Sequence, residues 1–298
     1  MHERYLGIDL GAETIKFILL ERQNGRLVIT YDSVVAHDKN PIHAFKKGIS
    51  TLDWESLTSV VTTGRISRVL NIERVPIKAA LAKGVGYKYP EIKPVTVVSI
   101  GSHGFSVLEL RTGNQQIFRE NSRCSQGTGN FLRQLVERFD LDIETASKMA
   151  CEVNEPSSLS SRCPVILKTD MTHLANRGED RRAILAGLYD AVCENVQVLI
   201  NPNLSPPRVL LSGGVCQSKR VRDNFRHFLT SKRMTLVESN PKDGLFLEAL
   251  GAALIAADQK PKPPSLEMVI SPRDHSSFEI TAPLNGALNR VKRMQMPE

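Results

Sequence analysis

The chain has 298 residues, of which 41% are hydrophobic and 24% are charged. This composition is typical of a globular protein, and it excludes disorder over most of the chain as well as a collagen-like repeat. The net charge is +7, but basic residues are spread along the chain and aromatic residues make up only 5%. Without a platform of interleaved aromatic and basic side chains, we expect no nucleic acid partner.

The sequence also argues against membrane insertion and against a disulfide framework. No apolar run reaches the ~18 residues of a membrane-spanning helix, and the opening MHERYLGIDL has no secretory signal pattern. We therefore expect no membrane partner and a cytoplasmic location. Five cysteines, an odd number without any CxxC pair, indicate neither disulfides nor a self-contained metal site. These are Cys124, Cys151, Cys163, Cys193 and Cys216, of which Cys193 is predicted to be a core residue.

The first part of the chain predicts a β-meander. Apolar strands are expected at 5–10, 15–20 and 26–31, separated by a turn at Gly11 and by Asn24-Gly25, a strong hairpin signal. No helix follows the first glycine, so the pattern excludes a dinucleotide-binding βαβ unit. Residues 77–85 are expected to form a helix.

A second meander repeats the first, with strands expected at 95–100, 105–110 and 115–118. Asp9-Leu10-Gly11 lies 90 residues before Ser99-Ile100-Gly101, and the strands that follow each turn align as well. Two copies of one meander predict a duplicated α/β protein with a cleft between its halves. Glycine turns that face a cleft suit phosphate binding, because backbone N–H groups can approach the anion closely.

The rest of the chain alternates between predicted helices and short strands. Helices are expected at 129–139, 143–152, 164–176, 179–200, 219–229 and 246–257. Strands are expected at 208–212, which ends in a Gly-Gly turn, at 234–239 and at 267–270. Between the last helix and the last strand, KPKPPS at 260–265 has the composition of a linker.

Several stretches resemble one known family. They are GIDLGAETIK, VTTGR, SRCSQGTGNFL, SSRCPVILKTDMTHLANRGED, ILAGL, SGGV and ALGAAL, and together they extend over roughly residues 4–258. The chain resembles the BadF/BadG/BcrA/BcrD ATPases, which include activators of 2-hydroxyacyl-CoA dehydratases and subunits of benzoyl-CoA reductase.

The resemblance implies the duplicated ribonuclease-H-like fold of actin, heat-shock chaperone ATPases and sugar kinases, with a nucleotide cleft between two subdomains. It divides the chain into a first nucleotide-binding subdomain at 1–95, a second at 96–258 and an extension at 259–298.

The resemblance also implies a site for ATP or ADP with Mg²⁺. Asp9 and Lys16 would have catalytic roles, with Lys16 meeting phosphate as a point charge. The expected nucleotide contacts are Gly11, Thr14, Gly101, Gly127, Thr128, Gly129, Gly213 and Gly214.

Cys124 and Cys163 match the family's two cluster cysteines, with 38 residues between them. In the family, two such thiolates hold one edge of a [4Fe–4S] cluster and a second subunit supplies the other two. The implied function is an ATP-dependent activator, a homodimer or pseudo-symmetric heterodimer. It would take electrons from ferredoxin or flavodoxin and pass them at low potential to a dehydratase or reductase.

The turns depart from the family pattern. Ala12 and Glu13 stand where Ser and Thr are usual, and Glu13 would repel phosphate unless a cation such as Lys16 intervenes. Ser99 and Gly104 replace two acids of the second turn, whose His103 is either a substitute polar group or simply solvated. The lost acids and the KPKPPS linker leave open a non-hydrolysing nucleotide-binding or scaffold module of a larger reductase assembly. The duplicated meander leaves open a small-molecule kinase of the same superfamily, although Ser99, where a kinase usually has Asp, argues against it.

Overall fold

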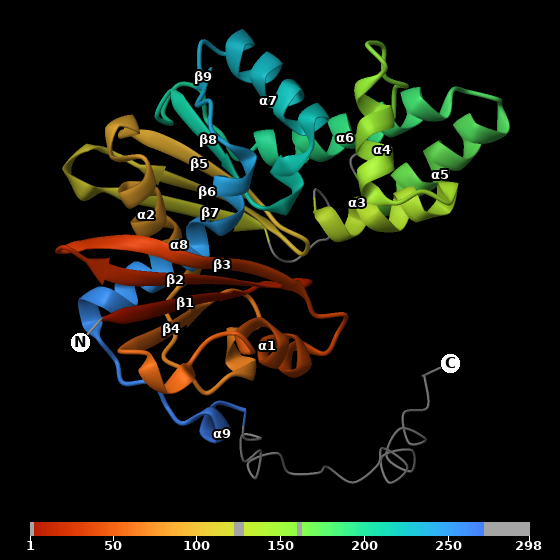
Figure 1. The fold of residues 1–298 in the computed structure, drawn as a ribbon. Helices are drawn as coiled ribbons and strands as arrows, with labels where there is room; N and C mark the ends of the chain where they lie inside the picture. The colour runs from red at the N-terminus through yellow and green to blue at the C-terminus, as the bar shows by residue number, and fades with distance from the viewer. Residues whose placement is uncertain (1–2, 122–127, 160–162, 271–298) are drawn as a thin grey trace, which may run out of the picture.

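The computed structural model describes residues 3–121, 128–159 and 163–270, which form two β-sheets with helices between and beside them (Figure 1). In the first sheet the strand order is β3-β2-β1-β4, with β1 at Arg4–Leu10, β2 at Thr14–Gln23, β3 at Arg26–Ala36 and β4 at Ser59–Thr63. The second sheet has the order β7-β6-β5-β8-β9. Its strands are β5 at Val95–Ile100, β6 at Phe105–Leu110, β7 at Gln116–Asn121, β8 at Arg208–Ser212 and β9 at Thr235–Leu236.

The two sheets repeat one arrangement, as the duplicated meanders predict. In each sheet an antiparallel meander is extended by a parallel strand beside its first member, β4 beside β1 and β8 beside β5. Asp9 lies opposite Thr63 on β4, and Ser99 lies opposite Ser212 on β8. Asp9 and Ser99 are therefore equivalent positions in the two halves, and the predicted duplicated α/β fold is confirmed.

The parallel strands β4 and β8 are each followed by a glycine with a left-handed backbone. Gly64 follows β4 with φ 101°, and Gly213 follows β8 with φ 88°. A side chain at either glycine would also strike the neighbouring main chain, at Leu10 in the first half and at Ile100 in the second. Glycine is needed at both turns because other residues rarely adopt positive φ.

Two helices, α2 at Ile77–Lys88 and α8 at Pro241–Gln259, lie between the sheets (Figure 1). Helix α8 packs its small residues on the first sheet, and α2 packs Leu81 and Val85 on the second. The helices cross at Gly84 and Gly251, where a Cβ would overlap the carbonyl oxygen of Leu247 or of Ala80. The backbones touch directly at this crossing, so no side chain fits between them.

A further group of helices shares one hydrophobic core with the second sheet. These helices are α3 at Gly129–Val136, α4 at Ile143–Cys151, α5 at Pro164–Asn176, α6 at Arg181–Gln197 and α7 at Lys219–Ser231. Of these, α3, α4 and α5 lie beyond the end of that sheet (Figure 1). Short 3₁₀ helices lie at Trp54–Ser56, Ser67–Val69, Pro90–Ile92, Thr112–Asn114, Glu137–Phe139 and Gly214–Gln217.

The structure differs from the sequence predictions in a few elements. Helix α1 at Pro41–Ile49 was not predicted, although Asn40 caps it by accepting a hydrogen bond from the His43 N–H and Pro41 stands at a favoured first position. Helix α8 begins at Pro241, five residues before the predicted start. The strand predicted at 267–270 is wrong, because Leu266–Val269 form the short helix α9.

The segment around α9 packs on the first half of the molecule. The Trp54 Nε1–H donates a hydrogen bond to the Pro264 carbonyl oxygen at 2.9 Å, and Val269 is fully buried against the same core. Residues 260–265, which have the composition of a linker, are therefore docked on this core. Their prolines have no N–H group to donate, but their carbonyl oxygens can accept hydrogen bonds such as the one from Trp54.

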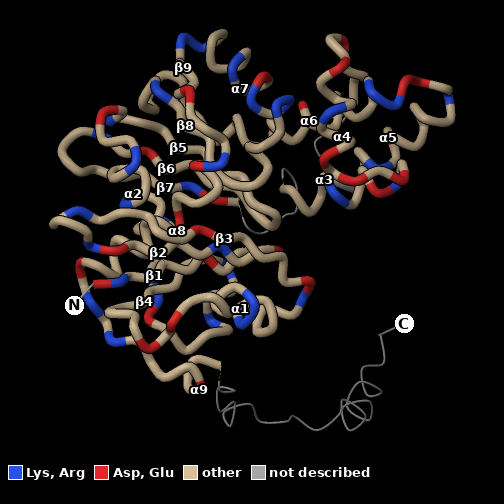
Figure 2. Tube along the Cα trace, in the orientation of Figure 1, with Lys and Arg blue, Asp and Glu red and all other residues tan. Residues whose placement is uncertain are grey.

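Charge is distributed over both halves. Figure 2 shows lysine and arginine interspersed with aspartate and glutamate along the elements of each sheet and of the helical region. Among the described residues, no helix combines the length and the apolar character that crossing a bilayer requires.

Substitution of Gly84 by Ala tests the helix crossing against a matched control on the same helix. We expect Gly84→Ala to lower the free energy of unfolding by about 2 kcal/mol, because overpacking against the Leu247 carbonyl exceeds the gain in helix propensity. Gly86→Ala meets only the end of the flexible Lys93 side chain, so it should leave stability unchanged or raise it by up to about 1 kcal/mol. Urea denaturation of both variants measures the difference, and equal stabilities would contradict the proposed close crossing.

Candidate functional site

The two glycine turns face each other across a cavity of about 300 Å³. Each turn is closed by its own hydrogen bond, from the Gly11 N–H to the Thr14 carbonyl oxygen at 3.0 Å and from the Gly101 N–H to the Gly104 carbonyl oxygen at 2.8 Å. Gly213 and Gly214 also line this cavity, which we call the turn cleft. The duplicated sheets thus bring together turns that are about 90 residues apart in the sequence.

Asp9 and Lys16 form an ion pair at the floor of the turn cleft. They lie opposite each other on β1 and β2, and the Lys16 Nζ lies 2.7 Å from Asp9 Oδ2. Burial lowers the pKa of Lys16, but the negative charges of Asp9 and Glu248 outweigh burial and leave the pKa above its usual value. Lys16 is therefore a buried cation, not a solvated strand residue.

Glu248 adds a carboxylate to the turn cleft from helix α8. The Ser99 hydroxyl donates a hydrogen bond to Glu248 Oε1 at 3.2 Å. Burial, together with the negative charge of Asp9, raises the pKa of Glu248 to about 7. In the second half, Ser99 thus stands at the position equivalent to Asp9, and it contacts the carboxylate of Glu248 on α8.

Arg65 brings a cation into the same cavity from the turn that follows β4. Its guanidinium lies against Gly104, in the space that a Cβ of that residue would need. Among the described residues Arg65 has no ion pair, whereas Lys16 is already paired with Asp9. The Arg65 guanidinium is therefore available to an anionic ligand.

Glu13 links the first turn to the second half of the molecule. Its carboxylate is 2.8 Å from Lys39 Nζ, 3.1 Å from an Arg133 guanidinium nitrogen and 3.8 Å from His103 Nδ1. Burial raises the pKa of Glu13, but Lys39 and Arg133 outweigh burial and hold the pKa below its usual value. Lys39 and Arg133, and not the expected Lys16, neutralise this carboxylate. Burial also lowers the pKa of His103, with nearby cations adding to the effect.

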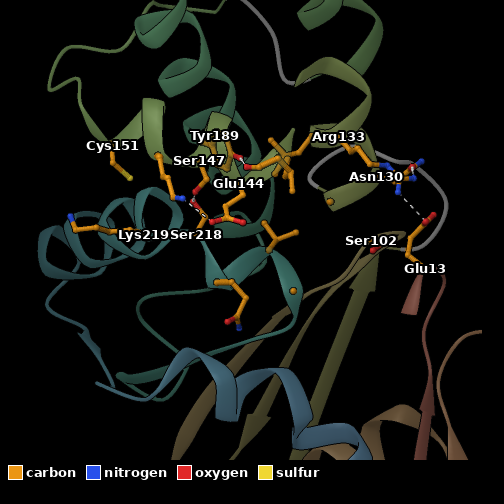
Figure 3. A pocket seen from close by; sticks show the side chains of 17 residues that line it. Glu13, Ser102, Asn130, Arg133, Glu144, Ser147, Cys151, Tyr189, Ser218 and Lys219 are labelled. Carbon is orange, nitrogen blue, oxygen red and sulfur yellow. Dashed lines mark hydrogen bonds and ion pairs between the residues drawn. The ribbon is translucent and has the colours of Figure 1, made fainter. Parts of the chain in front are cut away.

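A second and larger cavity, of about 690 Å³, adjoins the turn cleft and shares Glu13, Ser102 and Gly214 with it. We call it the helical pocket, because it lies among α3, α4, α6 and α7. Figure 3 shows Glu13 and Ser102 at one end and Cys151 and Lys219 at the other. Ile143, Tyr189 and Val215 give it an apolar lining, while Glu144, Ser147, Asn130 and Gln217 place polar groups around that lining.

The predicted nucleotide contacts are found at several places in this arrangement. Gly11, Thr14, Gly101, Gly213 and Gly214 line the turn cleft, and Gly129 lines the helical pocket. Thr128 is fully buried and caps α3 by accepting from the Phe131 N–H, so it lies outside both linings. Gly127 and Cys124 fall outside the described residues.

The described cysteines differ in their surroundings. Cys163 is partly exposed and stands immediately before α5. Cys193 is buried in the core as predicted, and burial raises its pKa. Burial also raises the pKa of Cys216 to about 12, whereas Cys151 lines the helical pocket. Within the described ranges, no three His, Cys, Asp or Glu side chains converge as metal ligands.

Arg65 and Glu248 line the turn cleft but were absent from the predicted site. Arg65 could have been found from the repeat itself, since Thr63-Gly64 ends β4 as Ser212-Gly213 ends β8. Glu248 is the one acidic residue in the run LFLEALGAALIAA, and an isolated charge in an apolar helix is a signal of function.

Comparison with known proteins follows this geometry. The (R)-2-hydroxyglutaryl-CoA dehydratase activating ATPase of Acidaminococcus fermentans is 23% identical, over 84% of this chain and 96% of that protein. The 2-hydroxyisocaproyl-CoA dehydratase activator of Clostridioides difficile is 25% identical over 85% and 95%. A subunit of the benzoyl-CoA reductase of Thauera aromatica is 25% identical over 84% and 92%.

Solved structures have the same fold. Component A of the Acidaminococcus fermentans dehydratase superposes with a TM-score of 0.77, at 24% identity, over 87% of this chain and all of that one. The activator from Clostridium difficile, with bound ADPNP, gives 0.73 at 22% identity, over 89% of this chain and all of that one. The BadF/BadG/BcrA/BcrD ATPase family profile matches residues 6–256. The chain therefore belongs to the BadF/BadG/BcrA/BcrD ATPase family, as its sequence motifs indicate.

Proposed function

We propose that this chain binds and hydrolyses ATP and uses the hydrolysis to pass an electron at low potential to a partner dehydratase or reductase. The observation that carries the proposal is the continuity of the two cavities. A cleft of about 300 Å³ between glycine turns, lined by charged side chains such as Lys16 and Arg65, adjoins an apolar pocket of about 690 Å³ and shares lining residues with it. The charged turn cleft suits the phosphates of a nucleoside triphosphate, and the apolar helical pocket suits its base.

The helical pocket fits the adenosine. Val215 and Ile143 present apolar surface for the base, and Glu144 and Ser147 on α4 place acceptors and a hydroxyl at the rim. Gly214 lies where the two cavities meet, and no atom lies within 4 Å of the position of its absent Cβ. The open space at Gly214 lets the ribose and the first phosphate approach the backbone.

The turn cleft fits the phosphates. Lys16 and Arg65 supply positive charge, and the backbones at Gly11 and Gly101 allow close approach. Because Lys16 already holds Asp9, and no three His, Cys, Asp or Glu side chains among the described residues converge as metal ligands, the cleft fits Mg²⁺ as an ion that arrives with the triphosphate. Mg²⁺ is commonly bound by one or two carboxylates together with substrate phosphates and water.

The electron-transfer part rests on the family relatives and on Cys163. Two relatives are named as activators of CoA dehydratases and a third as part of a reductase. Cys163 is accessible at the start of α5, and Val165 and Ile166 beside it expose 72% and 46% of their surface. With Cys124 it would hold one edge of a [4Fe–4S] cluster that a second copy completes. When bound, such a cluster stores and releases single electrons.

The proposed partners follow from this role. An exposed apolar pair next to a two-thiolate edge fits a second copy of the chain or a pseudo-symmetric partner, related by a two-fold axis. Ferredoxin or flavodoxin would supply the electron in the cytoplasm. The nucleotide-binding subdomains would be residues 1–95 and 96–258. Residues 259–298 would be an extension, and its described part packs on the first subdomain.

Substitution of Gly214 by Val tests the position of the adenosine. The position has open space and a φ outside the left-handed region, so we expect the variant to keep its thermal stability. Its side chain would enter the junction of the two cavities. The affinity for ADPNP and for adenosine should therefore fall by about tenfold or more, because a good contact is lost. Calorimetric titration measures both ligands. Unchanged affinity in a folded variant would place the nucleotide elsewhere.

Arg65→Ala tests the phosphate contacts, with Arg68→Ala as the matched control from the exposed 3₁₀ helix three residues further along. Loss of a charged hydrogen bond should weaken ADPNP binding by about tenfold or more and leave adenosine binding unchanged. Arg68→Ala should bind both ligands as the unaltered protein does. Equal losses for ADPNP and adenosine would show that Arg65 acts on folding and not on phosphate.

Iron and sulfide analysis tests the cluster. After anaerobic reconstitution we expect about four irons per two chains, with an EPR signal in the reduced form. Cys163→Ser and Cys124→Ser should each lose the iron, whereas Cys193→Ala should retain it because that thiol lies in the core. A chain that binds ADPNP but never takes up iron would overturn the electron-transfer part and leave nucleotide binding intact.

A further inference from the structure

Glu248 is an unusual carboxylate for this protein. Glu248 itself is half-buried, whereas the side chain of Glu109 is fully buried and lies 2.5 Å from an Arg111 nitrogen and 2.6 Å from an Arg119 nitrogen. Those arginines outweigh the effect of burial and hold the pKa of Glu109 below its usual value. A purely structural acid in this chain is thus neutralised by cations.

Glu248 has no such partner. No ion pair within the described part of the chain includes it, and its hydrogen bond comes from the neutral Ser99 hydroxyl. Lys16, whose charge also acts on Glu248, forms its ion pair with Asp9 at 2.7 Å. Packing does not explain the acid either, since its neighbours on α8 are apolar and buried. The half-buried carboxylate of Glu248 therefore lacks the neutralising partners that Glu109 has.

The position of Glu248 is set from both sides. The α2–α8 crossing holds the helix, because Gly251 lies less than one turn after Glu248 and touches the Ala80 carbonyl. From the second sheet, the Ser99 hydroxyl holds the Glu248 carboxylate by a hydrogen bond. Ser99 stands at the position equivalent to Asp9 of the first sheet. Glu248 thus lines the turn cleft from α8, next to the second glycine turn. That turn, residues 99–104, contains no acidic residue.

We propose that Glu248 is a catalytic residue of this ATPase: its carboxylate accepts the proton of the water that attacks the terminal phosphate. This inference rests on the proposed function. The water oxygen forms a bond to the terminal phosphorus while the bond from that phosphorus to the bridging oxygen breaks. ADP leaves with that electron pair, and the proton taken up by Glu248 passes to solvent. Arg65 faces the same space and stabilises the phosphoryl charge.

The charged groups around Glu248 determine its pH dependence. Burial and Asp9 raise its pKa to about 7, while Lys16, the Ser99 hydrogen bond and Arg65 oppose them. A base must be deprotonated before it can accept a proton. The hydrolysis rate should therefore increase with pH up to about 7 and level off above that value.

The experiment measures single-turnover ATP hydrolysis by the full chain across pH, together with ADPNP affinity. We expect Glu248→Gln to bind ADPNP within about threefold of the unaltered protein, to hydrolyse ATP about 100-fold more slowly and to lose the break near neutral pH. Ser99→Ala removes the hydrogen bond that favours the charged carboxylate, so it should retain hydrolysis and move the break to higher pH. Asp258→Asn, at the exposed end of the same helix, is the control and should behave as the unaltered protein does.

The outcomes separate this inference from the proposed function. If the unaltered protein hydrolyses ATP and Glu248→Gln does so at the same rate, the inference is wrong and the ATPase assignment stands. If the unaltered protein binds ADPNP without hydrolysing ATP, both the base and the hydrolysis are overturned. A Glu248→Gln variant that loses ADPNP binding in proportion to its rate would also overturn it, since the residue would then act on binding alone.

Discussion

The direct contact between the backbones of α2 and α8 is the constraint on which the rest of the structure depends. Each helix packs on one sheet, and glycines at 84 and 251 let the two helices touch. That contact fixes the separation of the sheets and so the width of the cleft between their turns. Interiors packed at this density transmit small displacements, so a helix held this closely can position a catalytic group.

The same helix connects both halves of the site. At its start, the Gly244 carbonyl accepts hydrogen bonds from the Ser212 hydroxyl at 2.7 Å and from the Gly213 N–H at 3.2 Å, which ties α8 to the second glycine turn. One turn further along, Glu248 lines the turn cleft. A duplicated fold therefore holds an unsymmetrical site: Asp9 with Lys16 in one half, and Ser99 with a carboxylate from α8 in the other.

The first turn shows how charge is balanced where the sequence departs from the family pattern. Glu13 would repel a phosphate, but Lys39 and Arg133 neutralise it from a loop and from α3. Because Arg133 comes from the second half, the ion pair also joins the two halves at the mouth of the helical pocket. The departure from the family pattern at Glu13 thus coincides with an ion pair to Arg133 across the cleft.

The sequence alone determined the duplicated meanders, most helices and the family, because alternation of apolar residues, glycine turns and short motifs are local signals. It also pointed to Asp9, Lys16 and four of the glycines that line the cleft, Gly11, Gly101, Gly213 and Gly214. It missed α1, whose Asn-Pro start was overlooked, and it took residues 267–270 for a strand because four apolar-rich residues cannot distinguish a strand from the short helix α9. Only the tertiary structure decided which charges meet: Lys16 with Asp9, Glu13 with Arg133, Glu248 with Ser99. These pairs join distant segments, and their geometry depends on the α2–α8 crossing rather than on any local pattern.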